Sequence, residues 1–199
     1  TEAAPSTGFT VTDALGREVM FEKVPERVVL NGKALFMIAD AIYLFPEAGE
    51  RVIGYGSTSQ GSLSFIPVID PAAKEKEVLE NQAGAEQIAA LKPDAVILKS
   101  YLAEELGKSV EALNIPVIYV DFETPEQYQR DLATLGQLFQ NPERAAEVAA
   151  YYTDEAAKLQ QATSALTDEQ KPKTLLVYYS SKDGAVAFNV PPMSWMQTA

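Results

Sequence analysis

Cysteine and histidine are both absent from this sequence of 199 residues. Without cysteine the chain forms neither disulfide bonds nor thiolate metal sites. Without histidine it lacks the side chain that most often acts as a base at neutral pH, so Ser-His and Cys-His nucleophile pairs are excluded. Any enzyme chemistry would have to depend on carboxylate or lysine groups.

Positive charge is also scarce, because 16 lysine and arginine residues stand against 28 aspartate and glutamate residues. The formal net charge of -12 would repel nucleic-acid phosphates over most of the surface, so no nucleic-acid partner is expected. Long apolar runs are missing as well. None approaches the roughly 20 residues that span a bilayer, so no transmembrane helix is predicted.

The first eight residues are small and polar and do not begin with methionine. We interpret them as a tether left after removal of a signal peptide. A lipid anchor on this tether is the only membrane attachment that we expect. An artificial N-terminal extension would have the same composition.

Short, nearly unbroken apolar runs alternate with segments of helical periodicity along the chain. Strands that are apolar on both sides are typical of a parallel sheet with helices on each face. The alternation predicts an α/β fold, preceded by a hairpin of residues 9–13 and 18–21. The expected strands are residues 27–31, 51–55, 94–98 and 116–121, and the expected helices are residues 34–45, 84–91, 103–113 and 125–139.

A long helix is predicted from Pro142 to residue 166, with Asn141 as its cap and proline at its first position. Its ~24 residues would make a rod of roughly 36 Å. After it we expect a buried strand at residues 173–179, a second strand at 185–189 and the start of a helix at 192–199. One or two strands cannot bury their own faces, so most of a second lobe is expected to be missing.

Several stretches of the sequence resemble one family, the class III, single-helix-hinged binding proteins of siderophore, haem and cobalamin ABC importers. Residues 12–19 and 25–29 resemble its opening hairpin and first strand, residues 85–97 its third strand with the preceding helix, and residues 141–145 and 171–177 its hinge and second lobe. The resemblance implies two Rossmann-like lobes with parallel sheets, joined by one long helix. The implied layout is a tether at 1–8, an N-terminal lobe at 9–140, a hinge helix at 141–167 and the truncated start of a C-terminal lobe at 168–199.

The resemblance also implies a function, which is to capture a metal chelate between the lobes and deliver it to the transmembrane subunits of an ABC permease. A ferric siderophore is the expected ligand, with haem and cobalamin as alternatives. The protein would be a monomer without catalytic activity or an intrinsic cofactor, in the periplasm or on the extracellular face of the cytoplasmic membrane. In this family the glutamate at the position of Glu86 meets an arginine on the transporter. From the residues alone, Glu86 can also be a first-turn carboxylate that only stabilises its helix.

Candidate ligand-binding residues follow the expected strands, because ligands bind beyond the carboxyl ends of open parallel sheets. Two lysines at these ends would attract an anionic group, although both can also be solvated surface residues. The aromatic residues can stack on a ligand or pack against the core. The candidates are Lys33, Tyr55, Ser57, Lys99 and Tyr101 in the first lobe and Tyr179 and Trp195 in the second.

Other interpretations stay open. Residues 54–61, rich in glycine and hydroxyls, suggest an anion-binding loop, but their spacing matches no phosphate-binding motif, so a flexible cleft loop is favoured. A small oxyanion such as molybdate or tungstate remains an alternative ligand. Asp121 and Glu123 would bind a metal in the less favoured case of an α/β enzyme. A scaffold or adhesion module without a cofactor is a third class.

Overall fold

The computed structural model describes residues 8–57, 65–80, 83–182 and 184–190, and its centre is a parallel sheet of five strands. The strands are β3 (Val28–Leu30), β4 (Val52–Gly56), β5 (Glu77–Leu79), β6 (Ala95–Lys99) and β7 (Val117–Val120). They lie in the order β5-β4-β3-β6-β7, and each pairs in parallel with its neighbours. The predicted α/β class is therefore confirmed, with one lobe present among these residues.

Helices cover both faces of this sheet because its strands are apolar on both sides. Ala95 and Ile97 of β6 belong to the core shared with α1 (Leu35–Ile42) and α6 (Pro125–Phe139). Val96 and Leu98 belong to the opposite core, which includes residues of α4 (Ala85–Ala90) and α5 (Lys108–Glu111). Shorter helices connect these elements: α2 (Ala48–Arg51), α3 (Ile66–Ile69) and η1 (Pro71–Glu75), with η2 (Ser100–Leu102) and η3 (Ala103–Gly107) ahead of α5.

Two sequence predictions need correction inside this lobe. Strand β5 was not predicted, because it is an edge strand of three residues in which Glu77 and Val78 are exposed, so the run of apolar residues is short. The segment 103–113, predicted as one regular helix, begins with the π-helical turn η3 and becomes α-helical only at Lys108.

The predicted N-terminal hairpin is confirmed as β1 (Phe9–Thr12) and β2 (Glu18–Phe21), which pair antiparallel. Phe9 and Phe21 stack across the pair with ring centroids 5.5 Å apart. The hairpin is fastened to α6, because the Thr134 hydroxyl donates to the Thr12 carbonyl at 2.8 Å.

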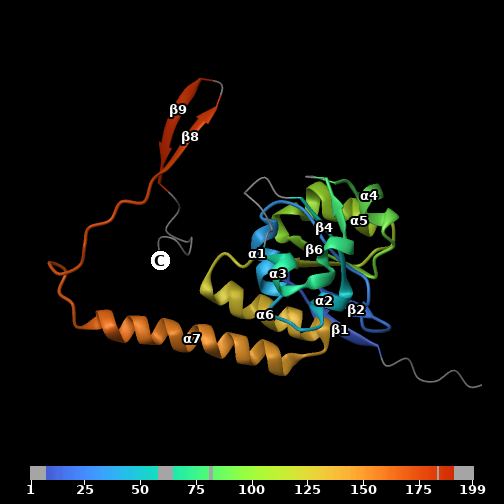
Figure 1. Cartoon of the computed structure of the whole chain (residues 1–199), viewed down its shortest axis with the longest axis horizontal. Helices are drawn as coiled ribbons and strands as arrows, with labels where there is room; N and C mark the ends of the chain where they lie inside the picture. The colour runs from blue at the N-terminus through green and yellow to red at the C-terminus, as the bar shows by residue number, and fades with distance from the viewer. Residues whose placement is uncertain (1–7, 58–64, 81–82, 183, 191–199) are drawn as a thin grey trace, which may run out of the picture.

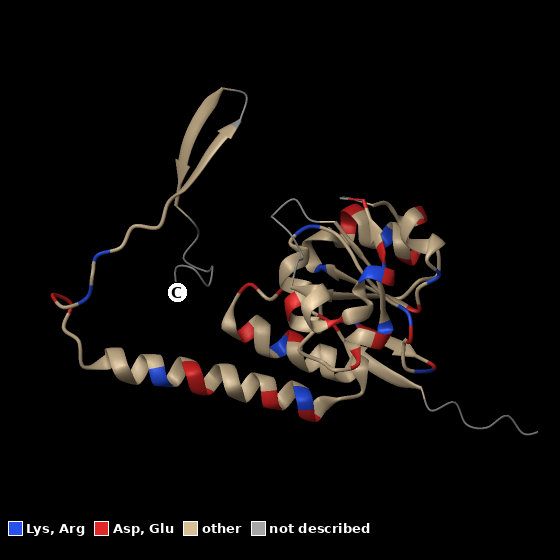
Figure 2. Cartoon of the chain, in the orientation of Figure 1, with Lys and Arg blue, Asp and Glu red and all other residues tan. Residues whose placement is uncertain are grey.

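The long helix α7 (Pro142–Ser164) has 23 residues, and its first turn is capped as predicted, by the Asn141 side chain accepting from the Arg144 N–H at 3.0 Å. Only its beginning is buried, at Ala145 and Val148, which pack on α6. The remainder is exposed and runs past the lobe (Figure 1). Charged side chains recur along its length (Figure 2).

The prediction of a buried strand at residues 173–179 is wrong. Residues 172–177 form no strand, and the strand β8 begins only at Tyr178 (Tyr178–Lys182). It pairs antiparallel with β9 (Ala185–Asn189), which lies where the second strand was predicted. Their large side chains are exposed, including Tyr179 and Phe188. The reason is that β8 and β9 pair only with each other in the described part of the chain, and a two-stranded ribbon cannot cover its own faces. The helix expected at 192–199 lies outside the described residues.

Candidate functional site

The strand order changes direction at β3, which places the next strand along the chain, β4, on one side of it and β6 on the other. In open parallel sheets such a switch point leaves a crevice beyond the carboxyl ends of the strands. Lys33 follows β3, Lys99 ends β6, and Tyr101 lies in the turn after it. The structure therefore gathers three predicted site residues at the point where the topology favours a ligand.

Two glutamates join these three residues into one group. Glu105 is 3.3 Å from the Lys33 ammonium, and Glu123 is 2.6 Å from the Lys99 ammonium. Burial raises the pKa of Tyr101, and the charges of Glu123 and Glu105 raise it further. We call Lys33, Lys99, Tyr101, Glu105 and Glu123 the rim cluster. The sequence analysis missed Glu105, because nothing in its local pattern separates it from an ordinary exposed helix residue.

Lys99 was predicted as a cation of the rim, but the structure buries its side chain completely. It shares the face of β6 with Ala95 and Ile97, so it points toward α1, where the Met37 sulfur is 3.8 Å from its nitrogen. The ammonium also donates to the backbone carbonyl of Asp121. Its role as a ligand contact stays a prediction, and its charge is already balanced by Glu123.

Asp121 and Glu123 pair with different cationic side chains, which argues against a metal site shared by the two carboxylates. Asp121 accepts from the Arg130 guanidinium at 2.6 Å and from the Ser100 hydroxyl, whereas Glu123 pairs with Lys99. No cluster of three or more metal-binding carboxylates occurs within residues 8–57, 65–80, 83–182 and 184–190. The alternative of a carboxylate-bound metal thus finds no geometric support there.

The other candidate ligand contacts are more dispersed. Tyr55 lies in the hydrophobic core with 7% of its surface exposed, and burial, followed by the charge of Asp70, raises the pKa of its hydroxyl. Ser57 is half-buried and its N–H donates to the Leu79 carbonyl at 2.8 Å. Tyr179 lies on β8, and the β8–β9 hairpin stands apart from strands β4 and β6 of the sheet (Figure 1). Ligand contact by these residues stays a prediction, and residues 58–61 of the glycine-rich loop and Trp195 lie outside the described residues.

Glu86 lies exposed in the first turn of α4. It borders a shallow depression of about 520 Å³ together with Ser109 and Leu113. This depression is on the α4–α5 side of the sheet, so a partner that contacts Glu86 would approach a different face from that of α1, α6 and α7.

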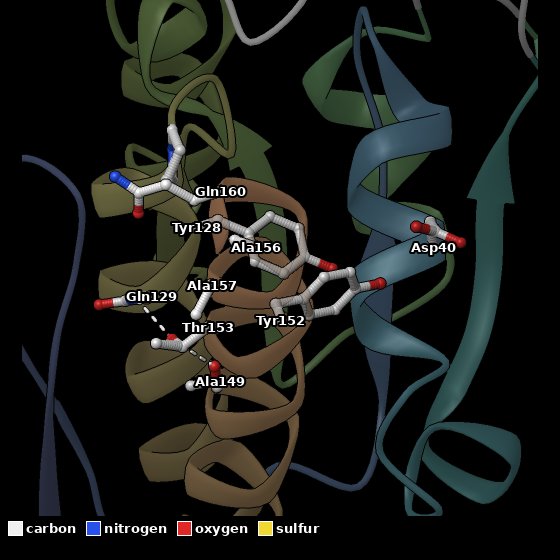
Figure 3. A pocket seen from close by; sticks show the side chains of 10 residues that line it. Asp40, Tyr128, Gln129, Ala149, Tyr152, Thr153, Ala156, Ala157 and Gln160 are labelled. Atoms are coloured by element: carbon white, nitrogen blue, oxygen red, sulfur yellow. Dashed lines mark hydrogen bonds between the residues drawn. The ribbon is translucent and has the colours of Figure 1, made fainter. Parts of the chain in front are cut away.

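A larger pocket of about 590 Å³ lies between α6 and α7 and was not anticipated from the sequence. Figure 3 shows Tyr128 and Tyr152 side by side, with their hydroxyls directed toward the side where Asp40 of α1 lies. The two rings meet edge to face at 5.1 Å, and Tyr128 meets Phe122 at 5.4 Å, so the pocket adjoins the loop that carries Glu123. Burial raises the pKa of the Asp40 carboxyl. Helix packing creates this pocket, so no local sequence signal reveals it.

Comparison with known proteins decides the family. Residues 70–194 match the model of the periplasmic binding protein family. The chain belongs to this family. Its members are solute-binding proteins that work with ABC permease subunits. No curated protein sequence matches the chain at a significant level.

Solved periplasmic binding proteins share the fold of this member. A periplasmic solute binding protein from Veillonella parvula is 24% identical with a TM-score of 0.67, over 81% of this chain and 50% of that one. The molybdate-bound protein MolA from Haemophilus influenzae is 17% identical with a TM-score of 0.66, over 81% and 56% of the two chains. The siderophore binding protein BauB, bound to two acinetobactin molecules and ferric iron, is 19% identical with a TM-score of 0.58, over 91% and 61%. The chain thus spans between half and three fifths of these structures.

Within the described ranges, no helix is both long enough and apolar enough to cross a bilayer.

Proposed function

We propose that this periplasmic binding protein captures a metal chelate, a ferric siderophore in the first instance, and delivers it to the transmembrane subunits of an ABC permease. Haem and cobalamin are further chelates that the same role would accommodate. In this proposal the protein catalyses no reaction, holds no cofactor of its own, and acts as a monomer in the periplasm or on the extracellular face of the cytoplasmic membrane.

The observation that carries the proposal is the rim cluster at the switch point of the sheet. Lys33 and Lys99 bring two cations to one edge of a chain whose net charge is -12, and Tyr101 adds a ring that is 53% exposed. Ammonium groups bind carboxylates and catecholates, although each of these lysines is paired with a glutamate in the free protein, and an exposed ring offers a face to a flat chelate. The cluster therefore favours an anionic, partly aromatic ligand.

A small oxyanion is the second candidate. MolA binds molybdate and has a TM-score of 0.66 with this chain, and BauB, with a TM-score of 0.58, binds a ferric siderophore complex. Both ligand classes occur on this fold. The exposed ring of Tyr101 beside the lysines favours the chelate over a bare oxyanion, which has no face to stack.

The long helix supports a two-lobed arrangement around this site. At 1.5 Å per residue the 23 residues of α7 extend about 35 Å, and Leu159 on its outer part is 68% exposed. We propose the layout expected from the sequence, in which residues 9–140 form the first lobe, residues 141–167 the hinge and residues 168–199 the start of a second lobe. The ligand would then lie between the rim cluster and that lobe, where Tyr179 and Trp195 would contribute.

A titration panel tests the ligand class. Quenching of the single tryptophan, Trp195, is followed on addition of ferric siderophores, haem, cobalamin and molybdate. Replacing Lys33 and Lys99 with methionine together should weaken binding of the preferred anionic ligand by at least about tenfold, whereas Lys74→Met, an exposed lysine on η1, should not. Unchanged affinity of the double variant would show that the rim cluster does not bind the ligand.

Transporter docking is tested separately, through Glu86. Glu86→Arg should leave ligand affinity intact and lower uptake into vesicles that contain the permease, because it would place two cations against each other. Glu143→Arg is the matched control, since Glu143 also lies exposed in the first turn of a helix. Equal uptake with the two variants would contradict the docking role.

A further inference from the structure

The Lys99–Glu123 pair joins two side chains of very different accessibility. The Lys99 side chain is fully buried, and the Glu123 side chain is 41% exposed, with 2.6 Å between ammonium and carboxylate. A buried ammonium needs an anionic partner, because leaving such a charge unpaired costs several kcal/mol. A half-exposed carboxylate can return to water at little cost.

Lys99 cannot easily exchange Glu123 for another carboxylate of its own surroundings. Asp121 is held by Arg130 at 2.6 Å and by the Ser100 hydroxyl. Asp131 is held by Arg130 at 2.8 Å and by two backbone N–H groups. Among the described carboxylates near Lys99, Glu123 is therefore the partner with the fewest other commitments.

Glu123 also lies in the loop after β7, which turns back toward the end of β6. Phe122 before it has a positive φ of 56°, which reverses the chain after β7, and the Glu123 N–H donates to the Gln127 side chain at 3.0 Å. The carboxylate thus reaches Lys99 at the carboxyl edge of β6, and the turn that follows this strand carries the exposed Tyr101. This is the place that a ligand's own anionic group would take.

We propose that Glu123 is a built-in placeholder, which an anionic group of the ligand displaces from Lys99 on binding. This inference rests on the proposed ligand-binding function of the rim cluster and adds its mechanism. The exchange keeps the buried ammonium paired in both states, so the ligand does not have to compensate for a desolvated charge. It also selects chemically, because a cationic or neutral ligand gains nothing at Lys99 and leaves Glu123 in place.

The experiment uses citrate as the anionic probe and follows the Lys99 side chain by NMR with isotope-labelled lysine, assigned through Lys99→Met. Glu123→Gln removes the competing charge but keeps an oxygen that can accept from Lys99, so the fold should persist, which a melting curve verifies. We expect this variant to bind citrate at least about tenfold more tightly than the wild type, with a shift of the Lys99 signal. Glu104→Gln removes one charge at an exposed glutamate that lies outside the rim cluster and pairs with Lys108. This control should change the affinity less than about threefold.

Glu123→Asp provides a second variant that keeps the charge. Its side chain is one methylene shorter, so its carboxylate cannot hold the 2.6 Å contact and citrate should again bind more tightly than to the wild type. Equal effects of Glu123→Gln and Glu104→Gln, a stationary Lys99 signal, or no citrate binding by Glu123→Gln at millimolar concentration would each overturn the placeholder. Parallel titration of the wild type with ferric siderophores separates the two proposals, since their binding without displacement would leave the proposed function standing.

Discussion

Asp131 fixes the backbone of Phe122. Its fully buried carboxylate, on α6, accepts a hydrogen bond from the Phe122 N–H at 2.8 Å, and a second one from the preceding N–H at 2.6 Å. The contact holds a residue with a φ of 56°, a conformation that side chains other than glycine adopt at a cost of about 1–3 kcal/mol. It therefore determines where the loop after β7, and with it Glu123, is placed.

Asp131→Asn should accordingly destabilise the protein. One amide oxygen can keep both backbone contacts, because both N–H groups donate to the same Oδ2, but the amide NH2 group then faces the Arg130 guanidinium. Burial raises the pKa of Asp131, so losing the charge offsets part of this cost, and we expect the free energy of unfolding to fall by about 1–2 kcal/mol. Urea unfolding followed by circular dichroism measures the change. Asp154→Asn, on the exposed part of α7, should stay within about 0.5 kcal/mol of the wild type. A similar loss in both variants would contradict the role of Asp131.

Ionisation of Asp70 should make the free energy of unfolding depend on pH in the acidic range. Burial would raise its pKa, but the Lys76 ammonium at 2.6 Å, the Tyr43 hydroxyl and the Ala72 N–H together hold the pKa below its usual value. A lowered pKa contributes stability above the unfolded value of about 3.9, and this contribution is lost as the pH falls through the folded value. As the pH falls from about 5 through the unfolded pKa toward the lower folded value, unfolding free energies should fall more steeply for the wild type than for Asp70→Asn. Glu75→Gln, exposed nearby, should follow the wild type, and parallel curves for all three would sink this prediction.

Removing two different tyrosine hydroxyls should have different effects on the free energy of unfolding. The Tyr128 oxygen is buried and makes no hydrogen bond of good geometry among the described residues, with only the Tyr152 hydroxyl close to it. The Tyr43 hydroxyl, in contrast, donates to Asp70 at 3.0 Å. Tyr128→Phe should leave the free energy of unfolding unchanged or raise it slightly, and Tyr43→Phe should lower it by about 1 kcal/mol. Thermal and urea unfolding of both variants decide the matter. A clear loss in Tyr128→Phe would mean that its hydroxyl has a partner after all.

Gly136 should be the tightest point between α6 and α7. A Cβ there would lie 2.7 Å from the Cβ of Ala145 and 3.3 Å from the backbone of the connecting turn. Gly136→Ala should therefore destabilise the protein by about 1–3 kcal/mol through overpacking. Gly49→Ala, with open space at the new Cβ in helix α2, should stabilise it by up to about 1 kcal/mol. Equal effects on the melting temperature would show that the helices can separate freely.

Much of the lobe could be predicted from the sequence because its signals are local. The apolar runs at β3, β4, β6 and β7 and the proline at the start of α6 lie where the pattern placed them. Strand β5 was not predicted because its three residues are mostly exposed and give no apolar run. The strand expected at 173–179 failed for the opposite reason, since its apolar residues have no covering partner within the described chain.

The candidate site was predicted only in part. The rule that ligands bind at carboxyl ends of strands led to Lys33, Lys99 and Tyr101, which the structure brings together. Pairing with Glu105 and Glu123 was not predictable, because each partner comes from a different connection and meets its lysine only when the sheet forms. The burial of Tyr55 and the pocket at Tyr128 and Tyr152 likewise arise from packing between distant segments.

The sequence by itself determined strands β3, β4, β6 and β7 with the helices between them, the capped start of the long helix at Asn141, and the absence of thiol and imidazole chemistry. These features depend on residue type and on neighbours a few positions apart. Only the tertiary structure decided which charges meet. Whether Lys99 is a free cation or a buried one depends on how strand β6, helix α1 and the loop after β7 pack together. Such contacts join segments far apart in the chain, and burial sets their strength, so no local pattern encodes them.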